Sequence, residues 1–184
     1  SWTTEPVNIA DAERLIAALR VEAPENANVL DYGCGTGRLA RYIPAGRYVG
    51  YDISSPMLAV AQREFPTYRF VDRLQPGPRF EAVVCNSVVQ YQPDRFWLDL
   101  LRDIAERARR VALIETYDSR WHNGQDGTDH SGPLHETRGG WDVPIFCRQS
   151  EEYEAVLREF GTVERRLLSD GSHSELVLYV VRRG

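Results

Sequence analysis

Three glycines separated by single residues follow a short apolar run in the first fifth of the chain. Val29 and Leu30 lead into Asp31, and Gly33, Gly35 and Gly37 come directly after. Glycines at this spacing allow a tight turn from a strand into a helix and a close approach of the backbone to a ligand. The pattern predicts a site for a nucleotide-like ligand at the carboxyl end of a strand.

A second carboxylate, Asp52, ends another apolar segment, 21 positions after Asp31. An acidic residue at about this separation from a glycine loop accepts hydrogen bonds from ribose hydroxyls in dinucleotide-binding proteins. A dinucleotide site would have the spacing G-x-G-x-x-G, whereas here the third glycine comes one residue early and Arg38 follows it. An NAD-type oxidoreductase therefore stays as an alternative, but the glycine spacing disfavours it.

Side chains suited to catalysis and to substrate binding concentrate in the segment 116–149. Histidine can act as a general base, and arginine with aromatic rings suits an anionic or planar small molecule. We expect His122 as the base, with His130 and His135 as close alternatives. We expect the substrate to contact Arg120, Trp121, Arg138, Trp141 and Arg148.

Two other interpretations of this segment remain open. The tryptophans could merely anchor a surface excursion to the core. The histidines could bind a metal with Asp126 and Asp129, but their spacing matches no familiar ligand pattern, so we expect no metal.

The composition excludes several classes of enzyme. The chain has 184 residues, and all 22 of its Lys and Arg positions are Arg. Without lysine there can be no Schiff-base lysine and no phosphate-loop lysine, although a GC-rich genome would also explain the bias. The formal net charge of −5 is unlike that of a general nucleic-acid binder. No apolar run approaches the roughly 20 residues of a membrane-spanning helix.

The elements that must position these residues alternate along the chain. Apolar periodicity predicts helices over 8–20, 37–43, 56–64, 94–108 and 150–160, the first and last with Asn8 and Ser150 as caps. Short strands are predicted from Val29 and over 48–51, 68–71, 80–85, 110–115, 163–168 and 175–181. Such alternation favours an α/β fold, a Rossmann-like, mostly parallel seven-stranded sheet with helices on both faces and a closing antiparallel pair.

The chain resembles the class I S-adenosylmethionine-dependent methyltransferases. Their first motif is an acidic strand end followed by G-x-G-x-G, matched here by Asp31, Gly33, Gly35 and Gly37. The segment Tyr48–Ser54 resembles their second strand with its ribose-binding acid, and Phe80–Tyr91 resembles their fourth strand and its loop.

The resemblance implies particular roles for further residues. Asp52 would bind the ribose, Ile53 and Met57 would flank the adenine, and Asp72 would lie near the adenine amino group. Asn86 would border the methionine part of the cofactor. Tyr91, in the same loop, is a further catalytic candidate.

On this resemblance we expect one methyltransferase domain over 1–184, with a helical cap at 1–25 and a substrate lid at 116–149. It would transfer a methyl group from S-adenosylmethionine, leaving S-adenosylhomocysteine, to an O or N atom of a small molecule. Nucleic acid is disfavoured because Asn86 is not followed by the Pro-Pro of amino-methylating enzymes. A protein acceptor and a non-catalytic cofactor-binding protein remain alternatives. Three scattered cysteines predict reduced thiols and a cytoplasmic protein. We expect the protein to be a monomer or a homodimer.

Overall fold

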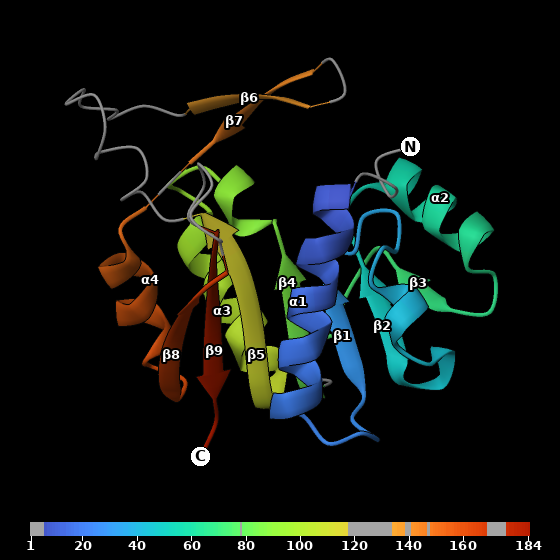
Figure 1. Ribbon diagram of the computed structural model, residues 1–184, viewed down its shortest axis with the longest axis horizontal. Coiled ribbons are helices and arrows are strands. Elements are labelled where there is room, and N and C mark those ends of the chain that lie inside the picture. Colours follow the sequence, from blue (N-terminus) through green and yellow to red (C-terminus); the bar gives the residue numbers. More distant parts are fainter. Residues whose placement is uncertain (1–5, 78, 118–133, 139–140, 147, 169–175) are drawn as a thin grey trace.

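A seven-stranded sheet forms the centre of the molecule (Figure 1), in the order β3-β2-β1-β4-β5-β9-β8. The computed structural model describes residues 6–77, 79–117, 134–138, 141–146, 148–168 and 176–184, with the backbone alone at 6–9, 11, 134–138 and 141–143. The strands are β1 (Val29–Tyr32), β2 (Tyr48–Tyr51), β3 (Arg69–Val71), β4 (Phe80–Asn86), β5 (Ala108–Tyr117), β8 (Thr162–Leu167) and β9 (Leu176–Arg182).

The first five strands of the sheet are parallel, and β9 runs antiparallel to both of its neighbours, β5 and β8. The predicted fold class, with its closing antiparallel pair, is confirmed. The strand order reverses between β1 and β4, and in open α/β sheets ligands bind at the carboxyl ends of the strands beside such a reversal.

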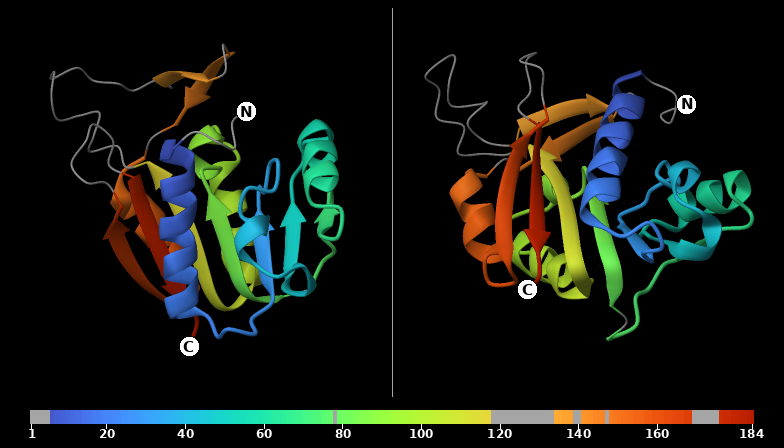
Figure 2. Two further views of the ribbon diagram at one scale, coloured as in Figure 1. Left: turned by 45° about the vertical axis from the view of Figure 1, so that its right-hand side comes forward. Right: turned by 60° about the horizontal axis from the view of Figure 1, so that its bottom comes forward.

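Helices cover both faces of the sheet (Figures 1 and 2). Along β4, Ala82 and Val84 belong to the apolar cluster on the side of α1 (Pro6–Glu22) and α2 (Ser55–Glu64). Val83 and Cys85 belong to the cluster on the side of α3 (Trp97–Arg107) and α4 (Ser150–Leu157). This alternation, with both faces buried, explains the near-continuous apolar sequence of the inner strands.

Several helix boundaries differ from the prediction. The first helix begins at Pro6, so Asn8 lies inside it, and α3 begins at Trp97. The cap of α4 is Gln149 rather than Ser150. A capping box links the Gln149 backbone amide to the Glu152 side chain at 2.8 Å and satisfies two backbone donors, whereas with Ser150 as the cap the third helical residue would be Tyr153, which cannot complete the box.

The helix expected over 37–43 is wrong. This segment contains turns and the three-residue 3-10 helix η2 (Ala40–Tyr42), and a second one, η3 (Ala45–Arg47), follows Pro44. Gly37 is left-handed and Pro44 removes a backbone donor, which leaves too few residues between them for two turns of α-helix.

The segment 116–149 has more regular structure than its sequence indicated. Its first two residues, Thr116 and Tyr117, continue β5 because they pair with β9. A two-stranded hairpin, β6 (Leu134–Arg138) and β7 (Trp141–Ile145), lies beyond the carboxyl ends of the parallel strands (Figure 2). The missed signal is the pair Gly139–Gly140, a sequence suited to a two-residue hairpin turn.

The end of α1 is joined to the closing strand pair by a carboxylate with little exposure. Glu22 accepts hydrogen bonds from Arg166 at 2.6 Å and from Arg182 at 2.6 and 2.7 Å. These two arginines also bind Glu164. The hydrogen bond from Arg182 is the main reason that the pKa of Glu22 lies below its ordinary value.

We expect Glu22→Gln to lower the free energy of unfolding at pH 7 by about 1–2 kcal/mol, because the two arginines lose a shared charged partner. Since the pKa of Glu22 is lowered in the fold, this difference should shrink as the pH falls below its unfolded value of 4.5. Urea unfolding at several pH values measures it. The matched variant Glu64→Gln, at an exposed pair with Arg63, should change stability by less than about 0.5 kcal/mol. Equal effects of the two variants would contradict the assignment.

Candidate functional site

The glycine loop joins the carboxyl ends of three strands. Gly33, Gly35 and Gly37 have φ angles of 77°, 53° and 81°, which favour glycine over any other residue. The amides of Gly33 and Cys34 donate to the Tyr51 carbonyl at 2.7 and 2.9 Å, which fixes the loop to the end of β2. A Cβ on Gly33 would lie 2.3 Å from the Val88 side chain, so the loop after β4 also depends on this glycine.

Asp52 lies against the glycine loop, as the sequence predicts. One carboxylate oxygen accepts the Gly35 amide at 2.8 Å, and the other accepts the Ser54 amide at 2.8 Å. Two backbone donors therefore fix the orientation of this carboxylate at the carboxyl edge of the sheet. Each oxygen keeps a further lone pair for a ligand hydroxyl.

Two apolar side chains near Asp52 are exposed. Ile53 is 81% exposed and Met57, in the first turn of α2, is 47% exposed. Exposed apolar side chains beside a polar site offer a surface to a flat ring. Asp72, which follows β3, is exposed, so the structure leaves its predicted role as an expectation.

Asp31 lies in a different environment from Asp52. Its side chain is 1% exposed, and its carboxylate accepts a hydrogen bond from the Tyr48 hydroxyl at 2.6 Å. Burial raises the pKa of Asp31 to about 7, against the opposing effects of the Tyr48 hydrogen bond and the charge of Arg38. The Asp31 side chain is thus held inside the fold by a tyrosine that the sequence did not single out.

Buried polar side chains meet where β4 and β5 end. Asn86 and Glu115 are paired across the two strands, and both are buried. Ser87, which has a left-handed φ of 56°, donates its hydroxyl to Glu115 at 2.8 Å. The sequence analysis did not select Glu115, although an acidic residue at the end of an apolar strand is the same signal that identified Asp31 and Asp52.

Tyr91 ends the 3-10 helix η4 (Val89–Tyr91), next to this polar group, and is half-buried. The neighbouring Gln90 accepts the Phe146 amide at its backbone carbonyl, at 2.7 Å, which joins η4 to the end of β7. The hairpin region therefore contacts the loop that follows β4.

Arg148, expected to bind substrate, has its guanidinium held by the protein. It donates to the carbonyl of Gln92 at 2.7 Å and to Asp94 at 2.8 Å, and it lies 4.6 Å from the ring centroid of Trp97. The side chain is 5% exposed. These contacts attach the segment after β7 to the start of α3, and the substrate-binding role stays a prediction.

The remaining predicted residues are not described in full. His135 and Arg138 lie on β6 and Trp141 lies on β7, in positions where the structure describes the backbone alone. Four of the expected catalytic and substrate-binding residues lie outside the described residues: Arg120, Trp121, His122 and His130.

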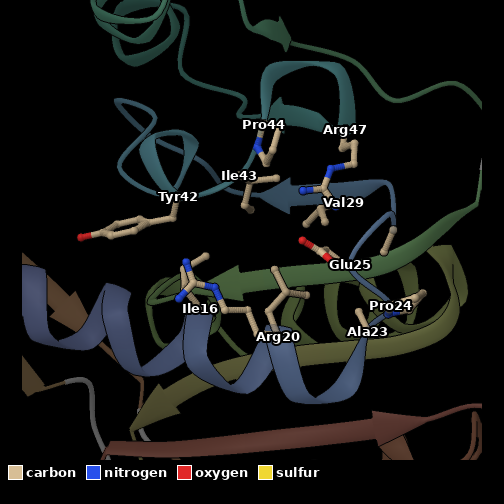
Figure 3. Close-up of a pocket in the computed structure, with 12 residues that line it drawn as sticks. Ile16, Arg20, Ala23, Pro24, Glu25, Val29, Tyr42, Ile43, Pro44 and Arg47 are labelled. Atoms are coloured by element: carbon tan, nitrogen blue, oxygen red, sulfur yellow. The ribbon is translucent and has the colours of Figure 1, made fainter.

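A cavity of about 490 Å³ lies at the other edge of the sheet (Figure 3). Ile16, Ala23, Val29 and Ile43 line it, with Arg20 and Arg47 pointing toward it. It lies where β1 and β2 begin, beside the short 3-10 helices that replace the expected α-helix. It is therefore separate from the glycine loop.

Comparison with known proteins agrees with this geometry. The family model of a methyltransferase domain matches residues 8–162, which is most of the chain. The chain belongs to the methyltransferase domain family. No helix in the described part of this methyltransferase domain is long and apolar enough to cross a membrane.

Two curated relatives of the domain are trans-aconitate 2-methyltransferases. The protein from Variovorax paradoxus is 38% identical over 45% of this chain and 35% of its own length. The protein from Yersinia pestis is 27% identical over 74% of this chain and 58% of its own length. The methyltransferase domain thus spans less than two thirds of the length of these curated relatives.

Among solved structures, the sugar N-methyltransferase KedS8 from Streptoalloteichus sp. ATCC 53650 has a similar fold. Its TM-score is 0.72 at 20% identity, over 95% of this chain and 87% of that one. At this identity the similarity supports the fold of the methyltransferase domain alone.

The raised pKa of Asp31 predicts an unusual dependence of stability on pH. Because the folded state keeps the Asp31 proton up to about pH 7 and the unfolded state loses it near 3.8, stability falls as the pH rises through this window. Between about pH 5 and pH 7.5 the free energy of unfolding should fall by about 2–3 kcal/mol because of Asp31. The Asp31→Asn variant, which cannot ionise, should lack this part of the profile.

Urea unfolding of the wild-type domain and Asp31→Asn at both pH values measures the difference. The variant should gain stability over the wild type as the pH rises. A stability difference that stays constant with pH would show that Asp31 is ionised normally in the fold.

Proposed function

We propose that this domain transfers a methyl group from S-adenosylmethionine to an O or N atom of a small molecule. The observation that carries the proposal is the Asp52 carboxylate, held by the Gly35 amide at the carboxyl edge of the sheet beside the strand-order reversal. A carboxylate fixed at this place suits the two adjacent hydroxyls of a ribose.

The residues of the site fit this cofactor. Asp52 would hold the ribose hydroxyls, and the exposed side chains of Ile53 and Met57 would contact the adenine. Gly35, where an added Cβ would meet nothing within 4 Å, would let the ligand approach the backbone, and the buried amide of Asn86 would face its amino-acid part. When bound, the cofactor supplies an electrophilic methyl group, and the protein's contribution is to orient the acceptor toward it.

The backbone after the glycine loop favours this cofactor over a dinucleotide. A pyrophosphate binds at the N-terminus of an α-helix, where aligned amides and the helix dipole attract negative charge. Here the glycines lead into turns and a 3-10 helix of three residues. An NAD-type cofactor would lack the helix end that normally binds its phosphates.

We propose a small-molecule acceptor, with the region 116–149 covering it as a lid. The hydrogen bond between Phe146 and Gln90, which joins the end of the hairpin to η4, supports this role. The net charge of −5 argues against nucleic acid. Trans-aconitate and amino sugars, suggested by the names of the relatives, belong in the first set of acceptors to be assayed.

The described cysteines bear on the compartment. Buried free thiols at Cys34 and Cys85 suit a reducing cytoplasm. We propose that the protein is a monomer or a homodimer.

Calorimetric titration with S-adenosylhomocysteine tests the proposal. We expect binding by the wild-type chain and a loss of affinity of at least about tenfold in Asp52→Ala, because the ribose loses charge-assisted hydrogen bonds. Asp99→Asn, at an exposed position on α3, is the matched control and should bind like the wild type. Thermal unfolding of each variant checks that the fold is retained.

Titration with NADH and mass spectrometry of any ligand that copurifies complete the test. Binding of NADH without binding of S-adenosylhomocysteine would contradict the proposed function. Unchanged affinity in Asp52→Ala would remove Asp52 from the cofactor site.

A further inference from the structure

A polar cluster is buried where β4 and β5 end. We define the β4–β5 polar cluster as Asn86, Ser87, Gln90, Glu115 and Thr116. Four of its members are at most 8% exposed, and Ser87 is half-buried. Two side-chain hydrogen bonds connect its members, from Ser87 to Glu115 at 2.8 Å and from Thr116 to Gln90 at 3.4 Å.

The β4–β5 polar cluster lowers the stability of the folded state. Within the described part of the chain, both polar atoms of the Asn86 amide and the Gln90 side-chain nitrogen have no hydrogen-bond partner. Each such buried group lowers the stability of the fold, because it has given up its hydrogen bonds to water. The left-handed backbone at Ser87 lowers it further. Apolar residues at these positions would avoid these costs, so the cluster is better explained by a ligand that completes it.

The strand order shows which part of a ligand would reach the cluster. On the proposed function, the adenosine lies at the end of β2, where Asp52, Ile53 and Met57 are. The cofactor would then extend across the glycine loop after β1 toward Asn86 at the end of β4, since these strands are neighbours in the sheet. Glu115 is the next residue beyond it, paired with Asn86 across strands about 4.8 Å apart. The methyl acceptor must lie beyond the methyl end of the cofactor, which is the side of β5.

The chemistry of Glu115 then limits the acceptor. Its side chain offers oxygen atoms that accept hydrogen bonds, and Ser87 orients one of them. An amine or a hydroxyl brings an N–H or O–H donor to such oxygens, whereas a carboxylate brings only further acceptors.

We propose that Glu115 accepts a hydrogen bond from the N–H or O–H of the methyl acceptor, and so selects amines and hydroxyls over carboxylates. Ser87 is a positioning residue that acts through Glu115. This inference rests on the proposed function and names the acceptor class of the same site.

Sinefungin tests the inference without knowledge of the acceptor. This cofactor analogue has a carbon that bears a primary amine in place of the methyl-bearing sulfonium. Its amine therefore occupies the position from which the methyl group leaves. We expect Glu115→Gln to weaken sinefungin binding at least about tenfold, with less than about a threefold change for S-adenosylhomocysteine, which has no group there. Calorimetry with the full chain measures both affinities.

Two further variants make the result specific. Ser87→Gly removes the hydroxyl, tolerates the left-handed backbone, and should lower the ratio of sinefungin to S-adenosylhomocysteine affinity by a smaller factor. A purely structural effect would lower both affinities together. Glu106→Gln, at an exposed position of α3, is the matched control and should leave the ratio unchanged.

The outcomes separate the two proposals. If the wild type binds neither ligand, the proposed function fails, and the inference fails with it. If the wild type binds S-adenosylhomocysteine but Glu115→Gln leaves the affinity ratio unchanged, the inference alone is overturned. A methyl acceptor found to be modified at a carboxylate would also overturn it.

Discussion

The hydrogen bonds between the glycine loop and the end of β2 determine the shape of the site. The Tyr51 carbonyl accepts two amides of the loop, and the Asp52 carboxylate accepts a third. The Val88 side chain, which comes from the loop after β4, occupies the space that a Cβ on Gly33 would need. Three strand ends are thereby fixed relative to one another before any ligand binds. Preorganisation of this kind lowers the entropy lost on binding.

The parts of the site that could be predicted from the sequence depend on local rules. Alternating glycines after an apolar run, and an acid at the end of the next strand, have meaning wherever they occur, and the structure brings Asp52 to the loop as expected. The environment of each acid depends on packing between distant segments. Asp31 and Asp52 have the same side chain near the ends of neighbouring strands, yet Asp31 is buried against Tyr48 and Asp52 is held by backbone amides. Periodicity contains no information on that difference.

Two further expectations show what helical spacing and residue type leave out, and of these the substrate-binding role of Arg148 stays a prediction. The segment 37–43 has helical spacing, but the backbone requirements of Gly37 and Pro44 at its two ends outweigh that preference. Arg148 was selected for its type and its neighbourhood, while its hydrogen bonds are made to residues more than 50 positions away. The same residue shows what an all-arginine basic set provides. One guanidinium binds two carbonyls and a carboxylate and also stacks on Trp97, which an ammonium group could not do.

The position of β9 has a consequence for how the protein is made. It is the last of the seven strands along the sequence, yet it lies inside the sheet, between β5 and β8. A nascent chain on the ribosome must wait for β9 to emerge before β8 can join the sheet, and β5 meanwhile presents an unpaired edge. The pairing of β5 with β9 joins residues between 59 (Tyr117 with Leu176) and 71 (Val111 with Arg182) positions apart, long-range contacts of the kind that slow folding. The unfinished chain therefore exposes an aggregation-prone strand during synthesis, and a chaperone that covers the β5 edge would act at this stage.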